Sequence, residues 1–141
     1  MARILAKSLS KYQVDILAGN HRFISDEPAG IGDDAGPSPF DLLLSGLASC
    51  TIITLHMYAN RKKWPLERVE MEASIRGMET QSSTGKSRSS VIDTQLTFHG
   101  PLTTEQLLRL GEIASRCPVH RTLKGEIQIL TRVANLEPGE Y

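Results

Sequence analysis

The feature that most constrains this fold is a long stretch without a formal charge, because no Asp, Glu, Lys or Arg occurs between residues 42 and 59. A stretch of this length must be considered as a membrane span. Serine, threonine and histidine side chains are distributed through it, however, and they argue against a span. In a soluble protein, a helix that is apolar on nearly all sides is usually central and covered on every side. In a domain this small, complete cover can require a second subunit.

Signals at both ends set the limits of this predicted helix. Ser38 is a favourable N-cap, Pro39 suits the first helical position, and Asp41 stands three residues after the cap. The basic run NRKKWP follows the apolar stretch. We therefore predict a helix over residues 39 to 61.

Strand patterns lie on both sides of this helix. The runs ILAKSLS, YQVDILAG and HRFISDE alternate and are rich in β-branched residues, with turn-formers at Gly19 and Asn20, so the first third predicts a β-meander. The glycine-rich segment EPAGIGDDAGPSP then predicts a loop into the helix. After the helix, LERVEMEASIRG and VIDTQLTFHG predict the strands of a hairpin, and METQSSTGKSRSS between them predicts a polar loop or hairpin tip.

A second helix is predicted near the end of the chain. Thr103 caps it, Gln106 stands three residues on, and the pattern continues to Cys117, where Pro118 breaks it. Its predicted apolar face consists of Leu107, Leu110, Ile113 and Ala114. The run EIQILTRV predicts a last strand. Since no repeat or linker interrupts the pattern, we predict one α+β domain over residues 1–141.

Charge and composition exclude several classes of protein. Lys and Arg total 16, as do Asp and Glu, so the chain lacks the basic excess that nucleic-acid binding requires. The first run, MARILAKSLSKYQVD, alternates polar and apolar residues, unlike a signal peptide. We therefore expect a cytoplasmic protein that binds neither nucleic acid nor membrane. In that compartment a cysteine pair is more often catalytic, redox-sensing or metal-binding than a permanent disulfide.

No metal or cofactor site is expected. The run CPVH has a short ligand spacing, but no second C-x-x-C or H-x-x-x-H accompanies it. The run TGKSRSS lacks the glycine that a phosphate loop needs, since that position is Thr80, and GIGDDAG is not the dinucleotide fingerprint. These comparisons leave a thiol site as the favoured chemistry.

The two cysteines stand in different predicted surroundings. Cys117 precedes Pro118 and is placed as the N-cap residue of PVHRTLK, where free backbone amides and the cations Arg116, His120 and Arg121 would stabilise a thiolate. Cys50 lies about three turns into the long helix, too deep for the helix dipole, so its activation would need tertiary neighbours. Packing of both thiols in the core remains the alternative.

Two motifs together resemble a known family. The runs GPSPFDLLLSGLASCT and EIASRCPVHRTL are similar to the OsmC/Ohr family of osmotically inducible and organic hydroperoxide resistance proteins, and GNHRFISDEP and RKKWPLERVE resemble its less characterised OsmC-like branch. The resemblance covers essentially the whole chain. It implies an intertwined homodimer, in which an antiparallel sheet wraps around long central helices.

The resemblance also implies an activity, that of a cysteine-based, antioxidant peroxidase acting on organic hydroperoxides. Cys50 would be the peroxidatic thiolate that becomes a sulfenic acid, and Cys117 would resolve it as a disulfide. A dithiol such as a lipoylated protein or a thioredoxin-type partner would then reduce the disulfide.

Supporting residues are assigned on the same grounds. Better-studied relatives pair an early arginine with a glutamate just after the proline that opens the helix. Here Phe40 follows Pro39, so the carboxylate candidate is Asp41, and Arg22 or Lys11 is the basic candidate. Arg116 and His120 are the basic candidates beside Cys117. Apart from the resemblance, the residue types of Phe40, Met57 and Tyr58, like those of Phe23 and Trp64, make them candidates to line a pocket for a hydrophobic peroxide, and ordinary core packing is the alternative for each. The alternative from another class is a non-catalytic module that binds a small ligand or senses redox state.

Overall fold

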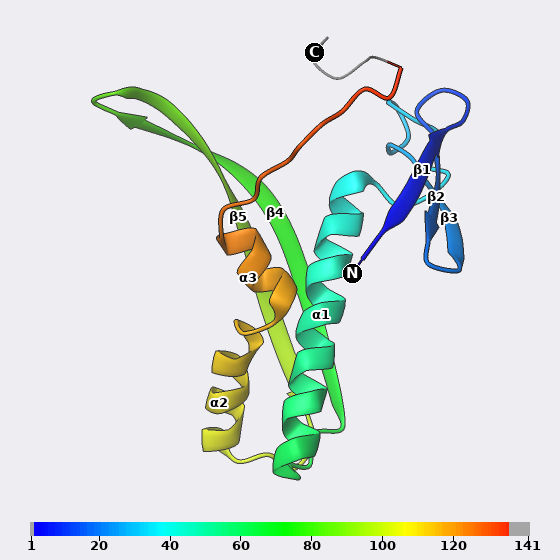
Figure 1. Cartoon of the computed structure of the whole chain (residues 1–141). Coiled ribbons are helices and arrows are strands. Elements are labelled where there is room, and N and C mark those ends of the chain that lie inside the picture. The colour runs from blue at the N-terminus through cyan, green and yellow to red at the C-terminus, as the bar shows by residue number, and fades with distance from the viewer. Residues whose placement is uncertain (1, 136–141) are drawn as a thin grey trace.

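The computed structural model describes residues 2–135 and has the α+β class that the sequence predicts. Three strands come first, followed by a long helix, a long hairpin and two shorter helices (Figure 1). The elements are β1 (Ile4–Ser8), β2 (Val14–Ala18), β3 (His21–Ser25), α1 (Pro39–Lys62), β4 (Arg68–Ser82), β5 (Gly85–His99), α2 (Thr104–Ala114) and α3 (Pro118–Lys124). The strands form two antiparallel sheets, ordered β1-β2-β3 and β4-β5.

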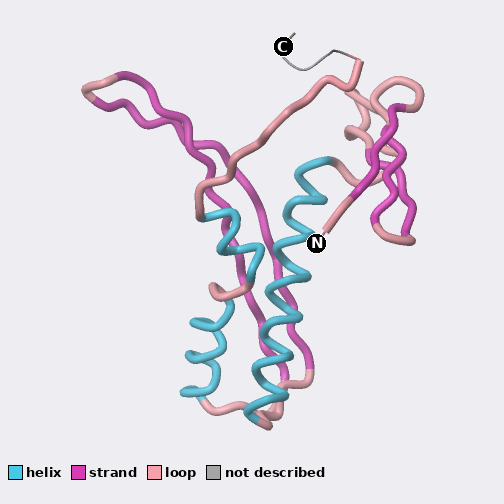
Figure 2. The backbone as a smooth tube through the Cα atoms, in the orientation of Figure 1, coloured by secondary structure: helices cyan, strands magenta, loops and turns pink. Residues whose placement is uncertain are grey.

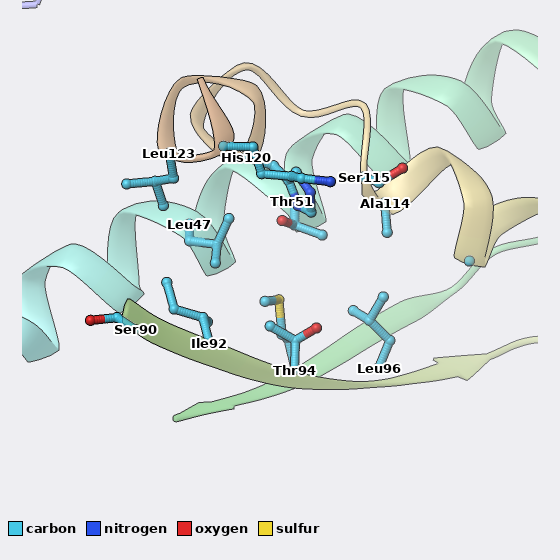
Figure 3. A pocket seen from close by; sticks show the side chains of 13 residues that line it. Leu47, Thr51, Ser90, Ile92, Thr94, Leu96, Ala114, Ser115, His120 and Leu123 are labelled. Carbon is cyan, nitrogen blue, oxygen red and sulfur yellow. The ribbon is translucent and has the colours of Figure 1, made fainter. Parts of the chain in front are cut away.

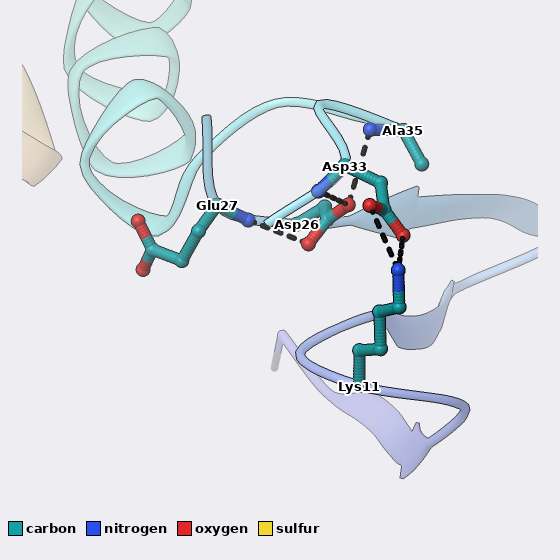
Figure 4. A network of polar contacts seen from close by, with 5 residues as sticks. All are labelled: Lys11, Asp26, Glu27, Asp33 and Ala35. Atoms are coloured by element: carbon teal, nitrogen blue, oxygen red, sulfur yellow. Dashed lines mark hydrogen bonds and ion pairs between the residues drawn. The ribbon is translucent and has the colours of Figure 1, made fainter. Parts of the chain in front are cut away.

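The loop from the meander to α1 is organised by one buried carboxylate. Asp26, only 2% exposed, accepts hydrogen bonds from the backbone amides of Glu27, Asp33 and Ala35 at 2.8, 3.1 and 3.2 Å (Figure 4). Burial of this carboxylate would raise its pKa, but these amides outweigh burial and the pKa is lowered. Lys11 Nζ lies 3.1 Å from each carboxylate oxygen of Asp33. The glycine-rich segment is therefore an ordered connection, as a loop into the helix requires.

The start and end of α1 confirm the predicted signals. Ser38 accepts a hydrogen bond from the Asp41 amide, and the Asp41 carboxylate accepts one from the Ser38 amide. Lys63 closes the helix with a left-handed φ of 58°, and its amide donates to the carbonyls of Ala59 and Asn60. The observed helix extends one residue beyond the predicted end, to Lys62.

Only one face of α1 is buried within the subunit. The buried side chains are Leu47, Thr51, Leu55, Tyr58 and Ala59. By length and composition the helix could cross a membrane, but a core helix of a soluble protein passes the same test. The complete cover predicted from its composition is therefore not supplied by residues 2–135 of a single chain.

The hairpin is longer than its composition predicts. The β4-β5 register runs from Arg68↔His99 to Ser82↔Gly85. Of the two alternatives predicted for residues 78 to 90, the hairpin tip is therefore confirmed and the polar loop is wrong for most of the run. A two-stranded ribbon can continue on backbone hydrogen bonds alone, so its outer part does not need the apolar alternation that sequence patterns detect. Figure 1 shows this ribbon extending beyond the helices.

The last predicted strand is also wrong for the single subunit. Residues 126 to 133 leave α3 as an irregular segment (Figure 2). Its apolar side chains are exposed, with Ile127 at 54%, Ile129 at 84% and Leu130 at 74%. A strand requires a partner edge, and in the described part of this chain no strand pairs with the segment.

The core lies where α1, α2 and the base of the hairpin meet. Its buried residues are Leu55, Tyr58, Val69, Leu110, Ile113 and Ala114. Tyr58 and Trp64 add an edge-to-face contact with ring centroids 5.4 Å apart. On α2 the predicted apolar face is buried except for Leu107, which is 37% exposed, and the helix ends at Ala114 rather than at Cys117.

Candidate functional site

Cys117 occupies the position predicted for it, at the N-cap of α3. Its backbone is extended, with φ −65° and ψ 144°, and Pro118 follows in the first helical position. The Sγ atom accepts a hydrogen bond from the His120 amide at 3.2 Å. The side chain is fully buried, at 0% exposure. The sulfur therefore satisfies one of the amides left free at the start of the helix.

The nearest side-chain partner of this sulfur on α1 is Thr51. Thr51 Oγ1 lies 3.5 Å from Cys117 Sγ, and either atom could be the donor. Sequence reasoning missed this residue because it concentrated on the neighbouring cysteine. The available signal was periodicity, since Thr51 stands between Leu47 and Leu55 at helical spacing on the buried face.

Cys50 lies about 100° around α1 from Thr51, at the edge of the face that this subunit leaves uncovered. It is partly buried, and both cysteines are free thiols. Residues at helical spacing place it in an apolar stripe of α1, which consists of Leu43, Gly46, Cys50, Ile53 and Met57. Leu43, Ile53 and Met57 are 37%, 54% and 68% exposed. Cys50 is thus the more accessible thiol and Cys117 the shielded one.

A cavity of about 440 Å³ lies between the helices and the hairpin. In Figure 3, Leu47 and Thr51 of α1, with His120 and Leu123 of α3, face Ile92, Thr94 and Leu96 of β5. Neither cysteine lines it, but two lining residues, Thr51 and His120, supply the hydrogen-bond partners of Cys117 Sγ. The sulfur therefore lies directly behind the cavity wall.

The basic residues proposed to support the cysteines differ in how close they lie to the thiol site. His120 is half-buried and lines the cavity, while its amide binds Cys117 Sγ. Arg116 is exposed, and its amide donates to the Ile113 carbonyl at 2.9 Å. Arg22 lies on β3 and pairs with Asp15 at 3.3 Å. Within residues 2–135 no hydrogen bond or ion pair joins Arg22 to either cysteine.

Asp41 serves the start of α1. Hydrogen bonds from the Ser38 amide and hydroxyl lower the pKa of its carboxyl group. The carboxylate is therefore held in the charged form by the cap, at the end of the helix that carries Cys50.

The predicted pocket residues Phe40, Met57 and Tyr58 do not form one cavity. Phe40 is 61% exposed, and Met57 belongs to the apolar stripe of α1. Tyr58 is a core residue whose hydroxyl accepts a hydrogen bond from Arg109 at 3.3 Å. That hydrogen bond lowers the pKa of Tyr58, although burial opposes it. Met57 is therefore the one of the three that shares a helix face with Cys50.

Comparisons with known proteins agree with this fold. The OsmC-like protein family matches residues 32–132, and the chain belongs to that family. An OsmC-like protein from Mycoplasma pneumoniae has a similar structure, with 23% identity, a TM-score of 0.69, and coverage of 89% of this chain and 88% of that one. The comparison with curated protein sequences found no match.

Two further structures carry names that refer to hydroperoxides. An organic hydroperoxide resistance protein OsmC from Legionella pneumophila is 20% identical, with a TM-score of 0.62 and coverage of 89% of this chain and 90% of that one. An organic hydroperoxide resistance protein from Elizabethkingia anophelis is also 20% identical, with a TM-score of 0.67 and coverage of 91% of each chain. At this identity the likeness establishes the fold, and the activity has to be argued from the site.

Proposed function

We propose that the protein is a thiol-dependent peroxidase that reduces organic hydroperoxides. The observation that carries this proposal is the unequal access of its two thiols. Cys50 is partly exposed on the apolar stripe of α1. Cys117 is fully buried, and its sulfur contacts Thr51, the residue that follows Cys50 on α1. In a two-cysteine peroxidase, one thiol must be accessible to react with the hydroperoxide, and the second, which can be shielded, then forms the disulfide with it.

The proposed chemistry has three steps. The Cys50 thiolate attacks the distal oxygen of the hydroperoxide, so that the O–O bond breaks and a Cys50 sulfenic acid forms. The departing alkoxide takes up the proton that the Cys50 thiol lost and leaves as the alcohol. Cys117 then attacks the Cys50 sulfur, forming a disulfide and releasing water. A dithiol of the lipoylated or thioredoxin type reduces the disulfide and is itself oxidised.

The substrate class is argued from the surroundings of Cys50. The neighbouring side chains on the stripe, including Ile53 and Met57, are apolar, which favours a hydroperoxide with an apolar body over hydrogen peroxide. Arg22 and Asp41 are proposed to support Cys50, and Arg116 and His120 to support Cys117. We place the reaction in the cytoplasm, where dithiol reductants are available.

A homodimer completes this proposal. The stripe on α1 and the apolar residues of segment 126 to 133 are both exposed in one subunit. A second copy of the chain that packed against the exposed side chains of the stripe, leaving an opening to Cys50, and supplied a strand edge for the segment would satisfy both. We therefore propose the intertwined dimer, with antiparallel sheet wrapped around the paired long helices.

Mass spectrometry after one equivalent of cumene hydroperoxide tests the proposal. The wild type should form a Cys50-Cys117 disulfide and one equivalent of alcohol. Cys117→Ser should stop after one turnover with an oxygen added at Cys50, and Cys50→Ser should release no alcohol. Absence of oxygen at Cys50 in Cys117→Ser would contradict the assigned roles.

One observation favours a second candidate, a non-catalytic module that binds a small ligand. The 440 Å³ cavity is of ligand-binding size, yet neither cysteine lines it. Under this alternative, peroxide would react with the thiols no faster than with a free cysteine, while a small apolar ligand would shift resonances of Leu96, Thr51 and His120. Rapid peroxide consumption that requires Cys50 decides for the peroxidase.

A further inference from the structure

The hydroxyl of Thr51 has a different partner from the hydroxyls of Ser45, Ser49 and Thr122. A helical serine or threonine commonly returns its hydrogen bond to the carbonyl one turn earlier. Three residues do so: Ser45 to Asp41 O at 2.6 Å, Ser49 to Ser45 O at 2.8 Å and Thr122 to Pro118 O at 2.9 Å. Thr51 instead directs its hydroxyl to Cys117 Sγ. Its orientation is therefore set by the sulfur.

Both partners are enclosed. Thr51 is 2% exposed and Cys117 is 0% exposed. In the described part of the chain, the sulfur is the hydrogen-bond partner of the Thr51 hydroxyl, and the second group at the sulfur is the His120 amide. The sulfur is thus held from two directions, by its own helix through His120 and by α1 through Thr51.

We propose that Thr51 is a positioning residue that holds the sulfur of Cys117 against α1, ready to attack Cys50. This inference rests on the proposed peroxidase. A hydroxyl suits the task because it accepts a hydrogen bond from a thiol and, after rotation, donates one to a thiolate. The contact therefore survives the proton loss that precedes attack.

The attack itself requires the sulfur to move from Thr51 to the adjacent residue of α1. Adjacent α-carbons on a chain are 3.8 Å apart, so the helix residue that Cys117 already touches is the direct neighbour of its target. The sulfur leaves Thr51 and bonds to the Cys50 sulfur, the S–O bond of the sulfenic acid breaks, and the departing hydroxide takes up the proton that Cys117 lost. Without the Thr51 hydroxyl, the sulfur is tied only to α3.

The test compares Thr51→Val, which keeps the shape of the side chain but removes the hydroxyl, with Thr51→Ser, which keeps the hydroxyl. Thr122→Val is the matched control, because it removes a hydroxyl that bonds to a carbonyl on the helix capped by Cys117. After one equivalent of cumene hydroperoxide, quenched samples are analysed for Cys50 sulfenic acid and for the disulfide over time.

Thr51→Val should convert sulfenic acid to disulfide more slowly by roughly tenfold, the factor that the loss of one hydrogen bond produces. Sulfenic acid should form at the wild-type rate, and further oxidation to sulfinic acid should increase. Thr51→Ser and Thr122→Val should resolve at the wild-type rate. Unchanged or faster resolution in Thr51→Val, or no rescue by Thr51→Ser, would overturn the inference.

Oxidation by diamide separates this inference from the proposed function, because diamide drives disulfide formation without peroxide. If the wild type forms the disulfide with diamide but neither sulfenic acid nor disulfide with hydroperoxide, the peroxidase proposal fails. The diamide rates of Thr51→Val and Thr51→Ser then still decide the role of Thr51. A wild-type protein that forms no Cys50-Cys117 disulfide with diamide overturns the positioning role itself.

Discussion

At the scale of single residues, the position of the Cys117 sulfur depends on one local rule and on one tertiary contact. The N-cap position of Cys117 follows from Pro118 alone, since that proline fits the first position of a new helix. The contact of Cys117 with Thr51 joins residues 66 positions apart, and no local pattern encodes it. For the same reason the motif only proposes Cys50 as a site residue, whereas the packing of α1 shows which helix face Cys50 occupies.

Replacement of the capping thiol should separate its structural role from its chemistry. Cys117→Ser keeps an acceptor for the His120 amide, whereas Cys117→Ala leaves that amide without one. We expect Cys117→Ala to be less stable than Cys117→Ser by about 1 kcal/mol, the usual contribution of an N-cap. Urea denaturation of both reduced variants measures the difference, and equal midpoints would show that the cap contributes nothing.

The buried carboxylate of Asp26 should make stability depend on pH in the acid range. Its folded pKa lies below the ordinary value of 3.8, because the amides of Ala35, Glu27 and Asp33 outweigh the effect of burial. Its contribution is therefore complete above that ordinary value and is lost as the pH falls through the folded pKa. The advantage of the wild type over Asp26→Asn in urea midpoint should be large at pH 7 and shrink below about pH 4.

An exposed carboxylate supplies the control for this titration. Asp93 is 59% exposed and pairs with Arg76 at the surface. Asp93→Asn should leave the urea midpoint nearly unchanged at neutral pH. A difference between wild type and Asp26→Asn that stayed constant from pH 7 to pH 3 would contradict the assigned network.

At the scale of elements, helices were predicted closely and the strands that depend on partners were not. Helix ends carry local signals, and both capping boxes, at Ser38 and at Thr103, formed as expected. The outer hairpin and the run over residues 126 to 133 depend on pairing with another strand, which composition does not specify. The sequence therefore underestimated the hairpin and assigned a strand to a segment that one subunit leaves unpaired.

The packing of α2 gives a matched pair of leucines for a stability test. Leu110 is 0% exposed within the core, whereas Leu108 on the same helix is 68% exposed. Leu110→Ala should lower the free energy of unfolding by about 2–5 kcal/mol, and Leu108→Ala by about 0.5 kcal/mol or less. Chemical denaturation of the two variants checks this. Equal losses would mean that α2 does not pack as described.

At the scale of the whole molecule, the OsmC-like fold was recognisable from two motifs. A second copy of the chain is proposed because one subunit leaves apolar side chains of α1 exposed. The sequence predicted that α1 is apolar on nearly all sides, and the structure shows that the side chains of its apolar stripe are the ones that remain exposed in one subunit. The identity of the covering surface could not be predicted from composition, because an apolar face specifies that it must be covered and not by what.

A charge placed on the stripe should dissociate the proposed dimer. Ile53 is 54% exposed in the subunit, so Ile53→Arg is compatible with the subunit fold but places a cation where the second copy is proposed to pack. We expect light scattering to give a dimer mass for the wild type at micromolar concentration and a monomer mass for the variant. A monomeric wild type with a normal unfolding transition would refute the dimer.

The amide of His120 offers a direct view of the state of the sulfur in solution. Because this amide donates to Cys117 Sγ, any reaction that removes the sulfur from the cap removes its acceptor. Its proton resonance should move upfield and its exchange with solvent should accelerate when the disulfide forms, because a short helix without its cap opens more readily. One backbone signal can thus report the redox state of the molecule without any added label.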